Sequence, residues 1–427
     1  MTSSLPSTVR VYRVGGSVRD ELLDLPPGDA DWVVVGATPE LMLASGFTPV
    51  GKDFPVFLHP DTHDEYALAR TERKHGRGYR GFEFFATPDV TLDDDLRRRD
   101  LTINAMARAP DGALIDLHGG QADLRAGILR HVSPAFVEDP LRVLRVARFA
   151  ARFGFVIATE TVALMRKLVD AGELSTLAPE RLWQELSRGL SEAHPSQMLR
   201  TLRVCGALAA LLPEVDALYA STLDGSDNAG QLTERALDWT AAHGCALPVR
   251  YAALVQNLGL PAGGSARGRR PGVAAGVARA NAVSLRLKAP ADARDAARLA
   301  ARWGALVGHA DALPPSRLLD VINAADALRR PERLDWLIDA GCARVAAHGS
   351  EGCAAPLLRA ALAAVRSVDA SAIARAAALQ PVADRTVERK TGDAIVVALR
   401  RARLAALRRF RRREAGDAPA VAPVKPR

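Results

Sequence analysis

Apolar and polar residues follow two different patterns along this chain. Up to about residue 135, short apolar runs rich in β-branched and aromatic residues are separated by Gly, Pro and Asp, which predicts strands. Helical patterns lie between these runs, so the N-terminal part is predicted to be an α+β or α/β domain. The predicted strands cover residues 9–14, 32–35, 56–58, 66–69 and 82–85.

From Pro140 onward, apolar positions recur every three or four residues in Ala-, Leu- and Arg-rich sequence, which predicts helices up to about residue 415. The first of these helices is predicted to begin after Pro140, because proline is favoured in the first helical turn. Breaks are predicted at 213–227, 261–272 and 310–315, and the tail from residue 416 is predicted to be disordered.

The composition is that of a globular chain and excludes a collagen-like or wholly disordered one. The 427 residues are 48% hydrophobic and 25% charged, and a chain of this length is expected to form two to four domains. The N-terminus lacks an apolar core and no apolar run reaches the length of a membrane span, so we expect a cytoplasmic protein. The four cysteines lie far apart without a CxxC pair, which predicts neither a zinc site nor a disulfide framework.

The net charge is +8, and arginine supplies most of the positive charge. Codon bias in a GC-rich genome and a polyanionic partner both explain this excess, so the total alone does not decide between them. The positions of the arginines are more informative, because several of them fall within short motifs.

The first motif, Gly15-Gly16-Ser17-Val18-Arg19-Asp20, lies between a predicted strand and a predicted helix. Glycine lets a backbone approach a ligand closely, free amides at a helix start bind phosphate oxygens, and Arg19 adds a positive charge. A plain strand–helix turn is the alternative.

A second motif places Asp29 and Asp31 at the start of the apolar run Trp32-Val33-Val34-Val35. In an extended chain, residues two apart point to the same face, so both carboxylates are expected to project together. Mg²⁺ prefers oxygen ligands, keeps several waters and binds substrate phosphates, so the pair predicts a magnesium site for phosphoryl transfer. A solvated acidic turn is the alternative.

Two further motifs carry arginines. The segment 97–105, RRRDLTINA, offers Arg99 to a triphosphate and Asp100 to a ribose hydroxyl, with a solvated charge run as the alternative. The segment 138–148, EDPLRVLRVAR, places Arg142, Arg145 and Arg148 three residues apart, which predicts one stripe on a helix. Asp139 and Arg142 together offer the donor and acceptor groups needed to recognise a base.

These motifs, taken in order with GRGYRG at 76–81 and PERLWQEL at 179–186, resemble the class II CCA-adding enzymes, tRNA nucleotidyltransferases of the polymerase-β superfamily, and in particular their proteobacterial branch. The resemblance is dense over about residues 9–215 and implies an α+β fold, with a polymerase-β-like head of mixed sheet and helices followed by an all-α neck, body and tail. It further implies addition and repair of the 3′-terminal CCA of tRNA from CTP and ATP with Mg²⁺, by a monomer or homodimer without a membrane segment.

The resemblance also implies roles for individual residues. Asp29 and Asp31 are the expected catalytic and metal-binding pair, Glu65 is a weaker candidate to support them, and residues 76–81 match a loop that helps to switch between C and A. Residues 179–185 are expected to brace the nucleotide-binding helix. The residues expected to bind ATP or CTP are Gly16, Arg19, Arg99, Asp100, Glu138, Asp139, Arg142, Arg145 and Arg148.

Relatives in the proteobacterial branch carry an HD phosphohydrolase site, and here its pattern is degenerate. The HD dyad is replaced by Gln256 and Asn257, while Leu232, Gly304 and Ala305 stand near the other ligand positions. Neutral amides are poor ligands for a transition metal, so we expect no metal-dependent phosphohydrolase activity.

The C-terminal segment 399–413 combines an apolar stripe with many arginines and predicts an amphipathic helix. Contact with tRNA phosphates is expected, and a solvated helix end is the alternative. The residues concerned are Arg400, Arg401, Arg403, Arg408 and Arg409.

The predicted domain plan has four parts and a terminus. It comprises a head (1–137), a helical neck that recognises the base (138–215), a degenerate HD-like body (216–330), a basic tail that binds tRNA (331–415) and a disordered terminus (416–427). Two alternatives remain open for the function: a bacterial poly(A) polymerase, and a catalytically inert RNA-binding protein.

Overall fold

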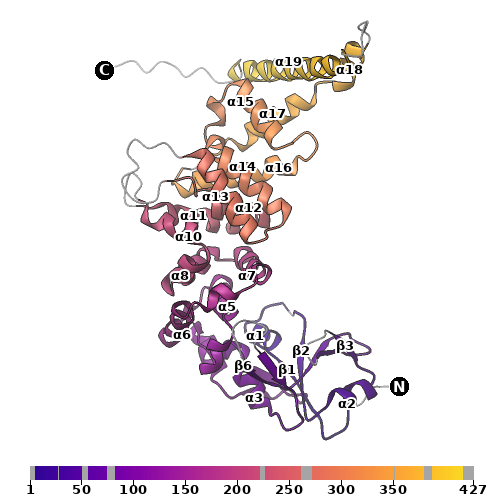
Figure 1. Ribbon diagram of the computed structural model, residues 1–427, viewed down its shortest axis with the longest axis vertical. Helices are drawn as coiled ribbons and strands as arrows, with labels where there is room; N and C mark the ends of the chain where they lie inside the picture. Colours follow the sequence, from indigo (N-terminus) through magenta and orange to yellow (C-terminus); the bar gives the residue numbers. More distant parts are fainter. Residues whose placement is uncertain are drawn as a thin grey trace. The chain divides into compact units, whose positions relative to one another are not determined.

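This computed structural model describes residues 5–26, 28–50, 56–74, 82–221, 227–260, 272–350, 352–378 and 387–416. The chain divides into two compact units, Met1–Ala217 with Arg286–Lys288, and Leu218–Leu285 with Ala289–Arg427. The predicted fold class, an α+β head followed by helices, is confirmed (Figure 1). No helix among the described residues is both long and apolar enough to span a membrane.

A mixed sheet forms the centre of the first unit. Within the described residues its strand order is β3-β4-β5-β2-β1-β8-β9, and the β2–β5 pair is parallel. The strands are β1 (Arg10–Val14), β2 (Asp31–Val35), β3 (Thr48–Val50), β4 (Val56–Leu58), β5 (Glu65–Leu68), β8 (Met106–Arg108) and β9 (Leu114–Asp116); the short strands β6 (Thr71–Lys74) and β7 (Phe82–Phe85) pair apart from it, as do β10 (Ile128–Leu129) and β11 (Val156–Ile157).

Strand β2 is buried on both faces, which explains its unbroken apolar sequence. Val33 packs with Val14 and Leu96 on one side, and Val34 packs with Phe57 and Leu68 on the other. Its N-terminal end, by contrast, carries the polar Asp31. A rigid, doubly covered strand therefore fixes the position of that carboxylate.

Helices cover the sheet and then continue beyond it in the first unit. Within the head lie α1 (Gly16–Leu22), α2 (Pro39–Ala44), α3 (Leu92–Arg97) and α4 (Gly120–Ala126). They are followed by α5 (Leu141–Phe153), α6 (Thr159–Asp170), α7 (Pro179–Ser191), α8 (Pro195–Val204), α9 (Ala207–Leu211) and α10 (Pro213–Asp216). Helix α5 packs against α7 and α8 and is buried along most of its length.

The second unit is helical throughout its described residues. Its core joins α14, α15, α16, α17 and α19 through residues such as Trp303, Leu318, Leu337, Leu358 and Leu407. The helices are α11 (Ala229–Ala242), α12 (Leu247–Val255), α13 (Val273–Arg286), α14 (Ala291–Val307), α15 (Pro315–Ala324), α16 (Glu332–Ala347), α17 (Ala355–Arg366), α18 (Ala370–Ala378) and α19 (Val387–Gly416).

Most predicted elements are present, with two corrections in the helical part. The five predicted strands agree with the structure to within a residue, and the helix predicted after Pro140 is α5. The break predicted at 213–227 is wrong at its start, because Pro213 begins the short helix α10, followed by a 3₁₀ turn. The break at 310–315 is confirmed, whereas 261–271, 75–81 and 417–427 lie outside the described residues.

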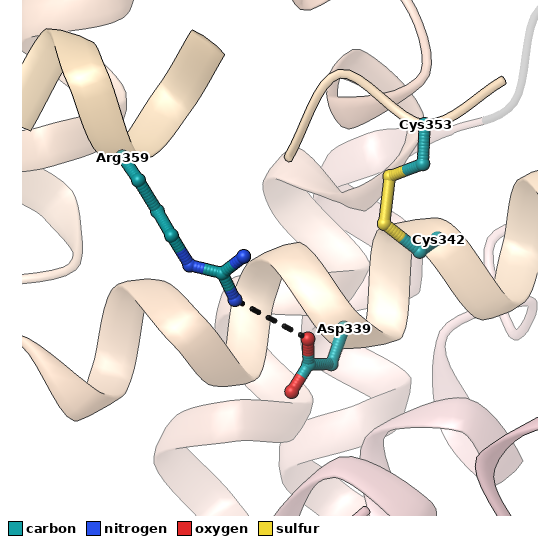
Figure 2. The surroundings of a disulfide bond; sticks show 4 residues. All are labelled: Asp339, Cys342, Cys353 and Arg359. Atoms are coloured by element: carbon teal, nitrogen blue, oxygen red, sulfur yellow. Dashed lines mark ion pairs between the residues drawn. A yellow bond between two sulfur atoms is a disulfide. The ribbon is translucent and has the colours of Figure 1, made fainter. Parts of the chain in front are cut away.

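The cysteine spacing predicted no disulfide framework, yet the structure contains a disulfide bond. Cys342 on α16 is bonded to Cys353, which lies just before α17, and their Cα atoms are 5.4 Å apart (Figure 2). Helix α16 ends at Ala347, and Gly349 adopts a left-handed conformation (φ 78°) that helps to reverse the chain. This reversal brings together two cysteines that sequence spacing alone does not pair.

Candidate active site

A cavity of about 500 Å³ lies in the first unit between the ends of β2 and β5, the start of α1, and α5. Such a volume is in the range of small-molecule sites. Among the described residues, eight arginines line it: Arg19, Arg70, Arg98, Arg99, Arg142, Arg145, Arg148 and Arg152. The carboxylates on its walls are Asp31, Glu65, Asp100 and Asp139. The excess of positive charge suits a multiply charged anion.

The acidic wall is made by two adjacent strands. Asp31 opens β2 and Glu65 opens β5, and the two are register partners in the parallel pair, so their side chains lie on the same face. Burial raises the pKa of the Asp31 carboxyl, Arg99 opposes this shift, and the nearby charge of Asp29 adds to it. Asp29 is exposed and does not line the cavity. The oxygens available here are of the kind that Mg²⁺ prefers.

Arg19 is held rigidly at the start of α1. It is 3% exposed, donates from Nε to Asp20 (2.8 Å), and also donates to the side-chain oxygen of Asn104. Its guanidinium lies 5.1 Å from the ring centroids of both Phe149 and Phe153. This fixed cation projects from the motif that the sequence predicted to bind phosphate.

Gly15 permits a close approach by Arg99. Its φ of 74° favours glycine, and a Cβ at this position would lie 2.7 Å from Nη1 of Arg99. A larger residue would therefore displace the guanidinium. Glycine at position 15 thus serves the site as well as the turn.

Asp100 connects the head to α5. One carboxylate oxygen accepts from the amide of Leu101 (2.9 Å) and from the side chain of Asn104 (3.0 Å), and the other accepts from Nε of Arg145 (2.7 Å). Burial opposes ionisation, yet Arg145 and Asn104 hold the pKa of Asp100 far below its usual range. Asp100 is therefore ionised and already engaged with protein donors.

The arginines of α5 differ in their partners. Arg148 donates from Nε to Glu185 of α7 (2.8 Å), so the segment 179–185 braces α5 as expected. Arg142 donates instead to main-chain oxygens of Ala135 and Arg98, and the cation nearest to Asp139 is Arg181, at 3.6 Å. The side chains of Asp139 and Arg142, which the sequence suggested for recognition of a base, thus have different partners, and the amide of Arg142 donates to the main-chain oxygen of Asp139 (3.1 Å).

The structure brings most of the predicted residues into one cavity. Asp29 and Glu138 do not line it, whereas the remaining predicted residues of the head and of α5 do. Sequence reasoning did not select Arg70, Arg98, Asn104 or Arg152. Arg152 is the one of these four that the sequence could most easily have predicted, since it continues the helical stripe of arginines one turn beyond Arg148.

In the second unit, the degenerate HD positions gather on α11, α12 and α14. The side chain of Gln256 lies against Gly304, and Asn257 donates to Thr233, which adjoins Leu232. Nη1 of Arg344, on α16, donates to the side-chain oxygen of Asn257 (2.9 Å). Among the residues that the structure describes, no group of three or more His, Cys, Asp or Glu could hold a metal ion.

Helix α19 matches the predicted basic amphipathic helix. Leu407 is fully buried, and Leu404 and Phe410 pack beside it. Arg401, Arg408 and Arg409 are exposed, Arg403 is half-buried, and Arg400 forms an ion pair with Asp320 (3.2 Å).

The head matches the family model described as the poly A polymerase head domain over residues 11–130, and residues 154–219 match the model of the probable RNA- and SrmB-binding site of polymerase A. An acidic strand end facing arginines on such a head defines a nucleotidyltransferase of the polymerase type.

Relatives named multifunctional CCA protein match almost the whole chain. The protein of Azoarcus sp. (strain BH72) is 52% identical over 87% of this chain and 92% of its own length, and that of Aromatoleum aromaticum is 55% identical over 86% and 93%. This chain belongs to the multifunctional CCA protein family, which confirms the predicted CCA-adding nucleotidyltransferase.

Solved structures with the same fold include the Bacillus stearothermophilus CCA-adding enzyme in complex with CTP. It has a TM-score of 0.63 and 22% identity, and the match covers 96% of this chain and 95% of that one. The Thermotoga maritima CCA-adding enzyme complexed with tRNA has a TM-score of 0.58 and 21% identity over 94% and 91%.

Proposed function

We propose that this protein builds and repairs the 3′-terminal CCA of tRNA in the cytoplasm, adding CMP and AMP from CTP and ATP without a nucleic-acid template. The observation that carries the proposal is the cavity in which Asp31 and Glu65 face a wall of arginines. Solved CCA-adding enzymes in complex with CTP, with ATP and with tRNA share the fold and support the choice of substrates.

Asp29 and Asp31 are the residues proposed to hold Mg²⁺. Their oxygens suit a hard cation, and the raised pKa of Asp31 indicates negative charge that the protein only partly compensates. The remaining coordination positions would be filled by phosphate oxygens and water. When bound, the ion supplies charge neutralisation at the α-phosphate and lowers the pKa of the attacking hydroxyl.

The chain's own residues then position the reactants. The arginines bind the triphosphate, and the 3′-oxygen of the RNA bonds to the α-phosphorus as the bond to the bridging oxygen breaks and pyrophosphate leaves. The hydroxyl proton passes to solvent. Glu138, Asp139 and Arg142 are the proposed base readers, and Arg142 must exchange its main-chain contacts to reach a base.

The test is incorporation of radiolabelled CTP and ATP into tRNA transcripts that end before CCA, at C and at CC. Asp29→Ala and Asp31→Ala should each abolish transfer while leaving tRNA binding intact, and Asp61→Ala, an exposed acid of the head, is the matched control. Incorporation of AMP alone would favour a poly(A) polymerase instead. Loss of tRNA binding together with transfer would indicate a folding role for the pair.

Exposed arginines of α19 are proposed to contact tRNA phosphates. Arg401, Arg408 and Arg409 are exposed, whereas Arg411 donates to main-chain oxygens before α15 and has a structural role. Replacing the three exposed residues with Gln should lower tRNA affinity and reduce the slope of log K against log salt by about 3. An unchanged slope would refute this assignment.

The HD-like region is proposed to lack phosphohydrolase activity. Neutral amides occupy the dyad positions, and Asn257 is engaged by Thr233 and Arg344. Nickel- or cobalt-stimulated hydrolysis of a 2′,3′-cyclic phosphate by the purified protein would contradict this proposal.

A further inference from the structure

Asp95 is a fully buried carboxylate that lies behind the arginines lining the cavity and does not itself line it. Its exposure is 0%, and it lies in the short helix α3. The two residues before it, Asp93 and Asp94, have different roles: Asp94 closes the capping box with Thr91, and Asp93 pairs with the exposed Arg97.

The carboxylate of Asp95 binds two guanidiniums at once. Oδ1 accepts from Nε (3.1 Å) and Nη2 (2.6 Å) of Arg98, and Oδ2 accepts from Nε (3.4 Å) and Nη2 (3.2 Å) of Arg99. Both arginines line the cavity. Because Asp95 binds the Nε side of each guanidinium, Nη1 of Arg99 points towards Gly15, where it also donates to the main-chain oxygen of Asn104 (3.4 Å).

Burying a carboxylate is costly unless its charge is compensated, and here two cations compensate it. Burial opposes ionisation, but Arg98 and Arg99 together hold the pKa of Asp95 below its usual range. The anion in turn allows two like charges to sit side by side without a ligand. Asp95 therefore preorganises a pair of phosphate donors before any nucleotide arrives.

Arg98 also contacts α5, but through its main chain. The main-chain oxygen of Arg98 accepts from Nη2 of Arg142. Asp95 binds the guanidinium of Arg98 and not this oxygen, so the Asp95 carboxylate does not hold Arg142 directly.

We propose that Asp95 is a positioning residue for nucleotide binding, which sets Arg98 and Arg99 to receive the triphosphate of either substrate. The inference rests on the proposed function, because it takes the cavity to be the nucleoside triphosphate site. Since Asp95 acts on phosphate donors and not on base readers, its loss should weaken CTP and ATP equally and leave the affinity for CMP unchanged.

The experiment measures binding of CTP, ATP and CMP by calorimetry to full-length wild type, Asp95→Asn and the matched control Asp93→Asn. We expect Asp95→Asn to weaken both triphosphates by about 10- to 100-fold, as misplacement of positioning groups does, with CMP binding and Asp93→Asn unchanged. Equal losses for CTP and CMP would show a general folding defect and overturn the proposal, as would unchanged CTP binding.

Asp95→Glu keeps the test decisive if Asp95→Asn does not fold, and a double-variant cycle strengthens the test if it does. Asp95→Glu retains the charge but lengthens the side chain, and should also weaken triphosphates without affecting CMP. In a cycle with Arg98→Ala/Arg99→Ala, adding Asp95→Asn should cost little more triphosphate affinity; a fully additive loss would overturn the proposal. Failure of wild type to bind CTP at all would instead count against the proposed function.

Discussion

The ion pair between Arg148 and Glu185 offers a sharp test of how α5 is held. The side chains are only 12% and 4% exposed, and Nε lies 2.8 Å from Oε2. Glu185→Gln keeps the shape but leaves the Arg148 guanidinium buried beside a neutral amide. Two unit charges about 4 Å apart interact by about 4 kcal/mol at an effective dielectric constant of 20.

Removing one partner of a buried pair typically costs about 3–5 kcal/mol, because the other charge remains buried. Glu192 lies 4.0 Å from Arg148 and compensates part of the loss, so we expect the lower end, about 3 kcal/mol. That free energy corresponds to a roughly 100-fold increase in the opening equilibrium of α5 and α7.

Hydrogen exchange of peptides from α5 and α7 measures this opening directly. Glu180→Gln is the matched control, since it makes the same change on the same helix at a solvent-exposed pair with Lys288 and should barely change the exchange rates. The double variant Arg148→Met/Glu185→Leu should recover most of the stability without recovering nucleotide binding. If Glu185→Gln exchanged no faster than Glu180→Gln, the pair would contribute nothing to holding α5.

Three other changes probe the site and the fold. The pKa of Asp31 is raised in the folded protein, so the metal-free protein loses stability as pH rises from the ordinary aspartate pKa through that raised pKa. Asp31→Asn should therefore raise the melting temperature of the metal-free protein at neutral pH. The same variant should abolish nucleotide transfer. Gly120→Ala would place a Cβ 2.3 Å from the main-chain oxygen of Thr102, and should cost about 1–3 kcal/mol in thermal unfolding. Cys353→Ser opens a loop spanning 11 residues and should destabilise the second unit by about 3 kcal/mol in oxidising buffer; a difference that persisted in excess reductant would refute this.

Sequence alone predicted the features that depend on local pattern. The strand at Asp31, the turn at Gly15 and the arginine stripe of α5 each follow from spacing within a dozen residues, and all three contribute to the cavity. The domain plan and the individual site roles stay predictions.

Other features depend on contacts that spacing does not encode. Glu65 reaches the acidic wall only through the parallel register of β2 and β5. Nothing in the run Asp93-Asp94-Asp95 distinguishes the one acid that is buried, and Arg142 binds main-chain oxygens of Ala135 and Arg98. For Glu65 and for the contact of Arg142 with Arg98, a partner distant in sequence decides the outcome.

The arginines that line the cavity also affect the balance between nucleotide addition and its reversal. Guanidiniums that hold the β- and γ-phosphates of a substrate are equally placed to hold the same two groups after they have been cleaved off. On the proposed assignment of the site, the leaving pyrophosphate is therefore retained close to the newly formed ester, where it can attack in reverse. Net extension of an RNA end by this protein consequently depends on the surrounding solution keeping free diphosphate scarce.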